Sequence, residues 1–163
     1  MHAEIDDHLA WLDQRIADAD RALAAAIRQT PAWRDQDDLL RSIPGIGPVA
    51  SRTLVADLPE LGTRSADQLV ALVGLAPYAD DSGRRQGGRH IRGGRATVRR
   101  ALYLAALTAA RVDGPLQVFA DRLKARGKAA KVVLIAVARR LLVIANAVVR
   151  DRRPWQPTRA ATR

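Results

Sequence analysis

Residues 43–51 read Ile-Pro-Gly-Ile-Gly-Pro-Val-Ala-Ser and separate two short helical segments. We expect one helix over about residues 35–42 before this stretch and another that ends near residue 58 after it. The two glycines permit a tight turn because glycine has no side chain to clash with the backbone. An apolar-Pro-Gly-apolar-Gly pattern between two short helices is typical of a helix-hairpin-helix motif.

Such a turn lets the backbone approach a phosphate closely. The N–H groups of Gly47 and Val49 would point outward at the start of the second helix, where anions bind favourably. A phosphate held in this way gives no information on base identity. The pattern therefore predicts that Gly45, Gly47 and Val49 bind nucleic acid. The alternative is a glycine turn that only links two packed helices.

The first 34 residues are acidic and have the periodicity of an amphipathic helix. Apolar side chains recur at alternating spacings of four and three, which is typical of a coiled-coil seam. The helix should end at Thr30-Pro31, because proline disfavours helical geometry in the residue before it. The seam needs a partner, either the rest of the chain or a second copy. It comprises Ile5, Leu9, Leu12, Ile16, Ala19, Leu23 and Ala26.

The charge is distributed unevenly along the chain. The whole sequence has 27 Lys and Arg against 17 Asp and Glu, a net charge of +10. Residues 1–40 hold nine acidic residues and four arginines, a net −5, so residues 41–163 carry +15. A field of that size predicts a polyanion partner. The abundance of arginine favours bidentate phosphate contacts, although a merely solvated surface is the alternative.

The stretch 78–94 is rich in glycine and arginine and has almost no apolar side chains. Seven arginines and no acidic residue lie between Arg84 and Arg100. Such a loop is either an ordered nucleic-acid contact or a disordered segment. Its place between well-formed helices favours the first. The predicted contacts are Arg84, Arg85, Arg89, His90, Arg92, Arg95 and Arg99.

The fold class predicted for the chain is all-α. A capping box at Ser65–Gln68 begins a helix that runs to about residue 73. Further helices are expected over about 95–112, 115–125 and 128–151, punctuated by glycine and proline. The predicted organisation is a coiled-coil-like helix over 1–34, a helical domain with the hairpin and the basic loop over 35–151, and a loose basic tail over 152–163.

Composition excludes several classes of site. The chain has no cysteine, and therefore no disulfide or thiolate zinc site. Its acidic residues are too dispersed for a metal site. The apolar runs 132–138 and 141–149 are separated by Arg139 and Arg140, and neither reaches the roughly 20 residues that span a bilayer. With no apolar signal segment, we expect a cytoplasmic bacterial protein associated with the nucleoid and not with a membrane.

Ser82 is the candidate nucleophile. It lies in Asp-Asp-Ser-Gly-Arg-Arg, next to a glycine and to guanidinium groups that would stabilise charge on a phosphoryl transition state. The sequence offers no obvious base to remove its proton. From composition alone, an ordinary loop serine is the better interpretation.

Four motifs in order resemble the C-terminal domain of the bridge-RNA-guided insertion-sequence transposases, the IS one-ten and IS one-sixteen group, which includes pilin-gene invertases. They are IPGIGPVAS at 43–51, VGLAPYADDSG at 73–83, RHIRGGRATVRRALYLAA at 89–106 and RGKAAKVVLIAVARRLL at 126–142. The resemblance covers about residues 38–157, and the heptad helix resembles the coiled coil that precedes this domain in the family.

The resemblance implies that Ser82 is the nucleophile that attaches to cleaved DNA in transposition. It also implies a guide (bridge) RNA, self-association through the 5–26 helix, and Mg²⁺ held by four acids of a RuvC-like domain. The sequence contains no such domain, so we expect a truncated or split transposase that binds no cofactor itself and is inactive alone. The alternatives are a non-catalytic DNA-binding module or decaying remnant, and a purely structural dimerisation protein.

Overall fold

A computed structural model describes residues 2–77, 91, 93–112 and 114–157. The described residues are all-helical and contain no strand, which confirms the predicted fold class. Their contacts divide the chain into two compact units, residues 1–35 and 36–163. The helices are α1 (His2–Gln29), α2 (Pro31–Arg41), α3 (Pro48–Asp57), α4 (Ala66–Val73), α5 (Ala96–Ala109), α6 (Pro115–Ala125) and α7 (Ala130–Asp151).

The first unit is built on α1, which ends at Gln29 as Thr30-Pro31 predicts. Its predicted seam residues are exposed, including Ile5, Leu9 and Ile16, each more than half exposed. Within residues 2–35 nothing covers this row of apolar side chains. The partner that the heptad pattern requires therefore does not come from within the described part of this unit.

The second helix begins earlier than predicted. α2 starts at Pro31 and not near Asp35. Proline suits the first position of a helix because its missing N–H would be unpaired there in any case. Pro31 therefore ends one helix and begins the next, and Asp35, Asp37 and Asp38 lie beyond the first turn of α2 and not at its start.

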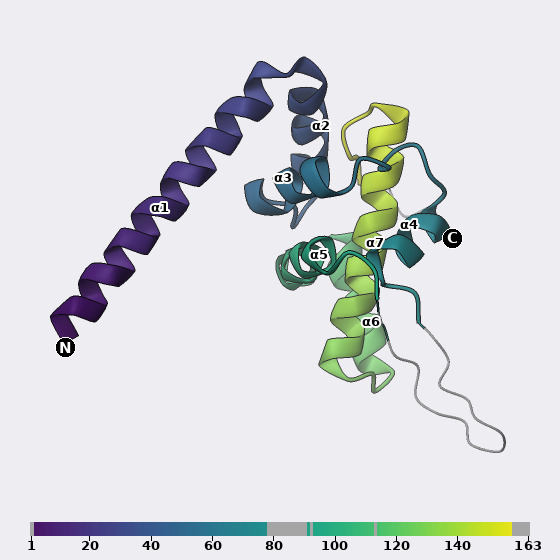
Figure 1. The fold of residues 1–163 in the computed structure, drawn as a ribbon. Coiled ribbons are helices and arrows are strands. Elements are labelled where there is room, and N and C mark those ends of the chain that lie inside the picture. The colour runs from purple at the N-terminus through teal and green to yellow at the C-terminus, as the bar shows by residue number, and fades with distance from the viewer. Residues whose placement is uncertain (1, 78–90, 92, 113, 158–163) are drawn as a thin grey trace. The chain divides into compact units, whose positions relative to one another are not determined.

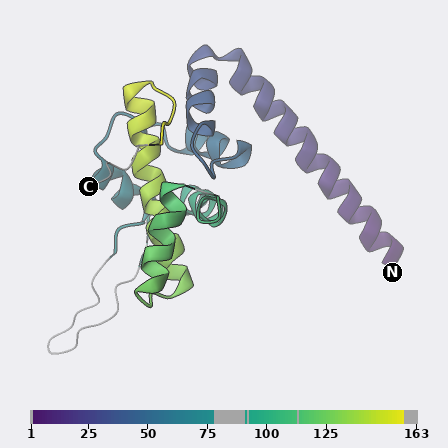
Figure 2. The ribbon, with the colours of Figure 1, turned by 180° about the vertical axis from the view of Figure 1, so that it is seen from behind.

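The second unit is organised around α7. Helices α4, α5 and α6 pack on α7, and α3 packs on α5. Both views show α6 beside the N-terminal part of α7 (Figures 1 and 2). Leu102 of α5 and Leu141 and Leu142 of α7 are completely buried in the core. Small residues at the same contact, such as Ala106 and Ala138, let the helices approach closely.

By length and composition, α7 would also be able to cross a membrane. Core helices of soluble proteins have the same properties, and the buried face of α7 forms much of this core. The buried face of α7 includes one polar residue, Asn146. The Asn146 side chain accepts a hydrogen bond from the Gly62 N–H (2.7 Å) and donates one to the Arg64 carbonyl (3.0 Å), which fixes the turn between α3 and α4.

The capping box at Ser65–Gln68 is present at the start of α4, and Gly74 ends this helix in the left-handed conformation. Both agree with the sequence pattern. After α7, the Trp155 backbone N–H donates to the Ser42 Oγ (2.8 Å), and the Trp155 ring is partly buried against the core. Part of the segment expected to be loose is therefore held against the turn that follows α2.

Candidate nucleic-acid interface

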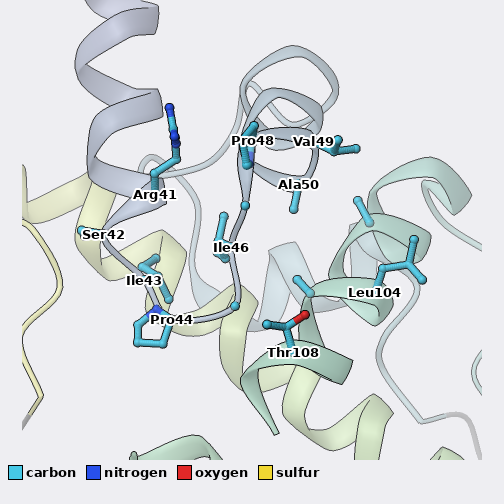
Figure 3. Close-up of a pocket in the computed structure, with 14 residues that line it drawn as sticks. Arg41, Ser42, Ile43, Pro44, Ile46, Pro48, Val49, Ala50, Leu104 and Thr108 are labelled. Carbon is cyan, nitrogen blue, oxygen red and sulfur yellow. The ribbon is translucent and has the colours of Figure 1, made fainter. Parts of the chain in front are cut away.

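The turn between α2 and α3 occupies residues 42–47 and lines an open pocket of about 600 Å³. The opposite wall comes from α5 (Figure 3). Two apolar side chains border the pocket and are more than half exposed, Val49 of α3 and Leu104 of α5. Arg41, at the end of α2, is the only cation that lines it among the described residues.

Gly45 and Gly47 have different roles in this turn. Gly45 has a φ of +91° and lies directly against α5, where an added Cβ would lie 2.6 Å from the Ala109 Cβ and 2.8 Å from the Ala105 oxygen. The close packing on α5 therefore requires glycine at position 45. Gly47 is exposed, and an added Cβ there would meet nothing within 4 Å. Only the second glycine leaves an open approach to the backbone.

The N-terminus of α3 opens at the pocket. Gly47 is the N-cap residue and Pro48 the first helical residue, and no described side chain caps this end. The first intrahelical hydrogen bond runs from the Ser51 N–H to the Gly47 oxygen (2.9 Å). The Val49 N–H therefore precedes the hydrogen-bonded ladder. This end of the helix favours an anion.

Asp37 and Ser51 fix the angle between the two helices. The buried Ser51 hydroxyl donates to the Asp37 carboxylate (2.6 Å), and the Arg41 guanidinium lies 3.8 Å from the other Asp37 oxygen. Neither Asp37 nor Arg41 was among the predicted site residues. Arg41 directly precedes the Ser-Ile-Pro-Gly turn, and this position is the signal that would have identified it.

The two ends of the segment that carries Ser82 are held together. Gly74 and Gly94 approach so closely that a Cβ on Gly94 would lie 2.5 Å from the Gly74 nitrogen. The Arg95 N–H donates to the Leu72 oxygen (3.0 Å). The Arg99 guanidinium donates to the Val73 oxygen (3.0 Å) and to the Gly93 oxygen. These contacts join residues 72–74 to residues 93–99 at the base of the segment, and we refer to them as the stem.

Arg95 also forms the best-defined ion pair of the second unit. Its guanidinium makes two hydrogen bonds to the Glu60 carboxylate (2.5 and 2.7 Å) and one to the Asp57 oxygen (2.9 Å). Hydrogen bonding from Arg95 lowers the pKa of Glu60 below its usual value of 4.5. Arg95 and Arg99 therefore hold the stem through internal bonds. Whether they also contact nucleic acid stays a prediction.

The remaining predicted residues lie outside the described part of the chain. These residues are Ser82, Arg84, Arg85, Arg89, His90 and Arg92. In the described ranges, no group of three Asp, Glu or His side chains is placed to hold a metal ion. The described acids thus do not fit a multi-carboxylate magnesium site.

The sequence model of a family described as "Transposase IS116/IS110/IS902 family" matches residues 37–121. This range includes the stem, Ser82 and the turn at residues 42–47, which we call the hairpin turn after its sequence pattern. The chain belongs to this transposase family. The match confirms the family resemblance and covers the first three of the four motifs, whereas the fourth, at 126–142, lies beyond the matched range.

Individual relatives extend the similarity to nearly the whole chain. An insertion element IS116 protein of Streptomyces clavuligerus is 34% identical over 98% of this chain and 39% of its own length. A pilin gene-inverting protein of Moraxella bovis is 32% identical, over 92% and 48%. An insertion element IS900 protein of Mycobacterium paratuberculosis is 31% identical, over 95% and 39%. The chain thus spans less than half the length of these relatives.

Proposed function

We propose that this chain is the DNA-engaging, serine-bearing part of an insertion-sequence transposase. The observation that carries the proposal is the family match, because the matched region contains the hairpin turn and Ser82 together. One relative is named for inverting a gene, which requires cutting and joining DNA. By this analogy the partner of the +15 region is DNA, with a guide RNA as a second partner.

In this proposal, the hairpin turn holds a DNA phosphate. The exposed Gly47 admits the phosphate, the Val49 N–H donates to it, and Arg41 lies on the same pocket to complement its charge. Contacts of this kind position a protein on DNA without reading the sequence. Specificity for a target would then come from elsewhere, which is consistent with a guide RNA.

Ser82 is proposed to attack a DNA phosphodiester. Its Oγ forms a bond to phosphorus, one deoxyribose oxygen leaves, the hydroxyl proton is lost and the leaving oxygen gains a proton. The arginines at 84, 85 and 89 would stabilise the charge on the transition state. By the family resemblance, Mg²⁺ is assigned to a RuvC-like domain, and the 163-residue chain by itself should bind DNA without recombining it.

The proposed setting is the bacterial cytoplasm, at the nucleoid, with self-association through α1. The alternative function is a non-catalytic DNA-binding module. One observation favours this alternative: the sequence offers no obvious base to remove the proton of the Ser82 hydroxyl. Ser82→Ala distinguishes the two functions, because only the catalytic one needs the hydroxyl.

The phosphate site is tested by the change Val49→Glu. Val49 is 66% exposed in the first turn of α3, so a carboxylate there should leave the fold intact and repel a phosphate. We expect the affinity for duplex DNA, measured by fluorescence anisotropy, to fall by about tenfold or more. The matched control is Val118→Glu, since Val118 is 67% exposed near the start of α6. Equal affinities for the two variants would contradict the assignment.

A further inference from the structure

The only lysines of the chain lie at and beside the turn between α6 and α7. Lys124 is in the last turn of α6, Lys128 in the connection and Lys131 in the first turn of α7. Arginine supplies the other 24 of the 27 basic residues. With Arg126, these side chains are exposed. We refer to Lys124, Arg126, Lys128 and Lys131 as the lysine corner. It lies at the N-terminal end of α7, away from the α2–α3 turn, which contacts the chain beyond the other end of this helix.

The charge of the lysine corner is largely uncompensated. Residues 115–150 contain eight basic residues and one acidic residue, Asp121. Asp121 pairs with Lys124 at 2.8 Å. Two nearby arginines, Arg122 and Arg140, lie over the Phe119 ring. In the described part of the chain, no acidic group is paired with Arg126, Lys128 or Lys131. Exposed cations without partners attract a polyanion most strongly.

Only small residues lie between these cations in the sequence. The intervening residues are Ala125, Gly127 and the pair 129–130, all of them exposed alanines or glycine. Gly127 has a φ of +70°, and an added Cβ there would meet nothing within 4 Å. No large side chain therefore separates the lysines from an approaching phosphate chain.

We infer that the lysine corner is a second contact surface for the backbone of duplex DNA, separate from the hairpin turn. The inference rests on the proposed function. Arg126, Lys128 and Lys131 lie in the fourth motif, at 126–142, to which the sequence analysis assigned no DNA contact. Lysines act as point charges that contact phosphates without reading sequence. Phe119, the only aromatic residue of α6 and α7, is partly buried beneath arginines, so stacking on unpaired bases has no platform here.

The test replaces the three unpaired cations, with Arg126→Gln, Lys128→Gln and Lys131→Gln in one variant of the full chain. Binding to a duplex of about 30 base pairs is measured over a range of salt concentrations. Each lost phosphate contact should reduce the slope of log affinity against log salt by about 0.9. We expect a total reduction of about two to three, with an affinity loss of about tenfold or more in low salt.

The matched control removes the same charge elsewhere, with Arg15→Gln, Arg28→Gln and Arg152→Gln. Its salt slope should stay close to that of the unmodified chain. Far-UV circular dichroism and thermal unfolding should be unchanged for both variants, because all six side chains are exposed. A folded triple variant with the reduced slope would support the lysine corner as a DNA contact.

Two results would overturn the inference. One is a lysine-corner variant that keeps the slope of the unmodified chain. The other is a variant that loses affinity for a structured RNA and keeps its affinity for the duplex, which would assign the corner to RNA. If the unmodified chain failed to bind duplex DNA at all, the proposed function itself would fall, so the two failures are distinguishable.

Discussion

At the scale of single residues, two pairs of residues shape the candidate interface: Gly45 with Gly47, and Glu60 with Arg95. Gly45 packs against α5 and Gly47 is open, although the sequence presents the two glycines as equivalents. Glu60 and Arg95 are 35 residues apart and form a bidentate pair. No local pattern links them. Sequence reasoning identified the turn and the arginine, but only the fold shows what each of them contacts.

Changing Gly45 to alanine should destabilise the protein, and changing Gly47 should not. Gly45→Ala places a methyl group 2.6 Å from the Ala109 Cβ of α5, which is a steric clash, and forces an L residue into a left-handed conformation. Overpacking and backbone strain together should lower the free energy of unfolding by about 2–4 kcal/mol. Gly47→Ala should cost less than about 1 kcal/mol. Urea unfolding measures both, and equal losses would contradict the packing role of Gly45.

The Glu60–Arg95 pair should make stability depend on pH. The pKa of Glu60 is lowered in the folded protein, so its contribution is present above the unfolded pKa and is lost as the pH falls through the folded value. Glu60→Gln should therefore lower the urea midpoint near neutral pH, and the difference from the unmodified chain should vanish in acid. The exposed Asp38→Asn is the control. A difference that persists unchanged in acid would exclude this ion pair as its cause.

At the scale of elements, the sequence predicted helix positions correctly where a helix start or stop signal, such as a proline or a capping box, lies at the helix end itself. The range of α6, Pro115–Ala125, is as predicted, and the capping box of α4 is present. Prediction failed for the start of α2, because a proline can both end one helix and begin another. The role of Asn146 was also missed. One amide in an apolar run gives no sign of the turn that it will bind.

The seam of α1 predicts self-association of the chain. A change of Leu9→Asp with Ile16→Asp places two charges on the apolar row, and sedimentation should then show a shift from dimer or larger assembly to monomer. Ala3→Asp with Ala10→Asp adds the same charge on the other face of α1 and should leave the assembly intact. An unmodified chain that sediments as a monomer would exclude a second copy as the partner of this helix.

At the scale of the whole molecule, charge and family point to the same function. The +15 region, residues 41–163, lies within the unit 36–163, which contains the hairpin turn, the stem and the lysine corner. Sequence alone predicted the all-helical class and the family, because helix punctuation and motif order are local signals. It did not predict the stem, because the hydrogen bonds from Arg95 to Leu72 and from Arg99 to Val73 form only once α4 and α5 have packed.

The proposed role of Ser82 predicts that its side chain becomes joined to DNA. The most direct measurement incubates the chain with a nicked duplex, Mg²⁺, guide RNA and the acidic domain of a relative, and then maps any protein–DNA adduct by mass spectrometry. We predict a DNA phosphate attached to Ser82, and no adduct with Ser82→Ala, which should bind the duplex as tightly as the unmodified chain. An adduct that persists in Ser82→Ala, or that maps to another residue, would contradict the account.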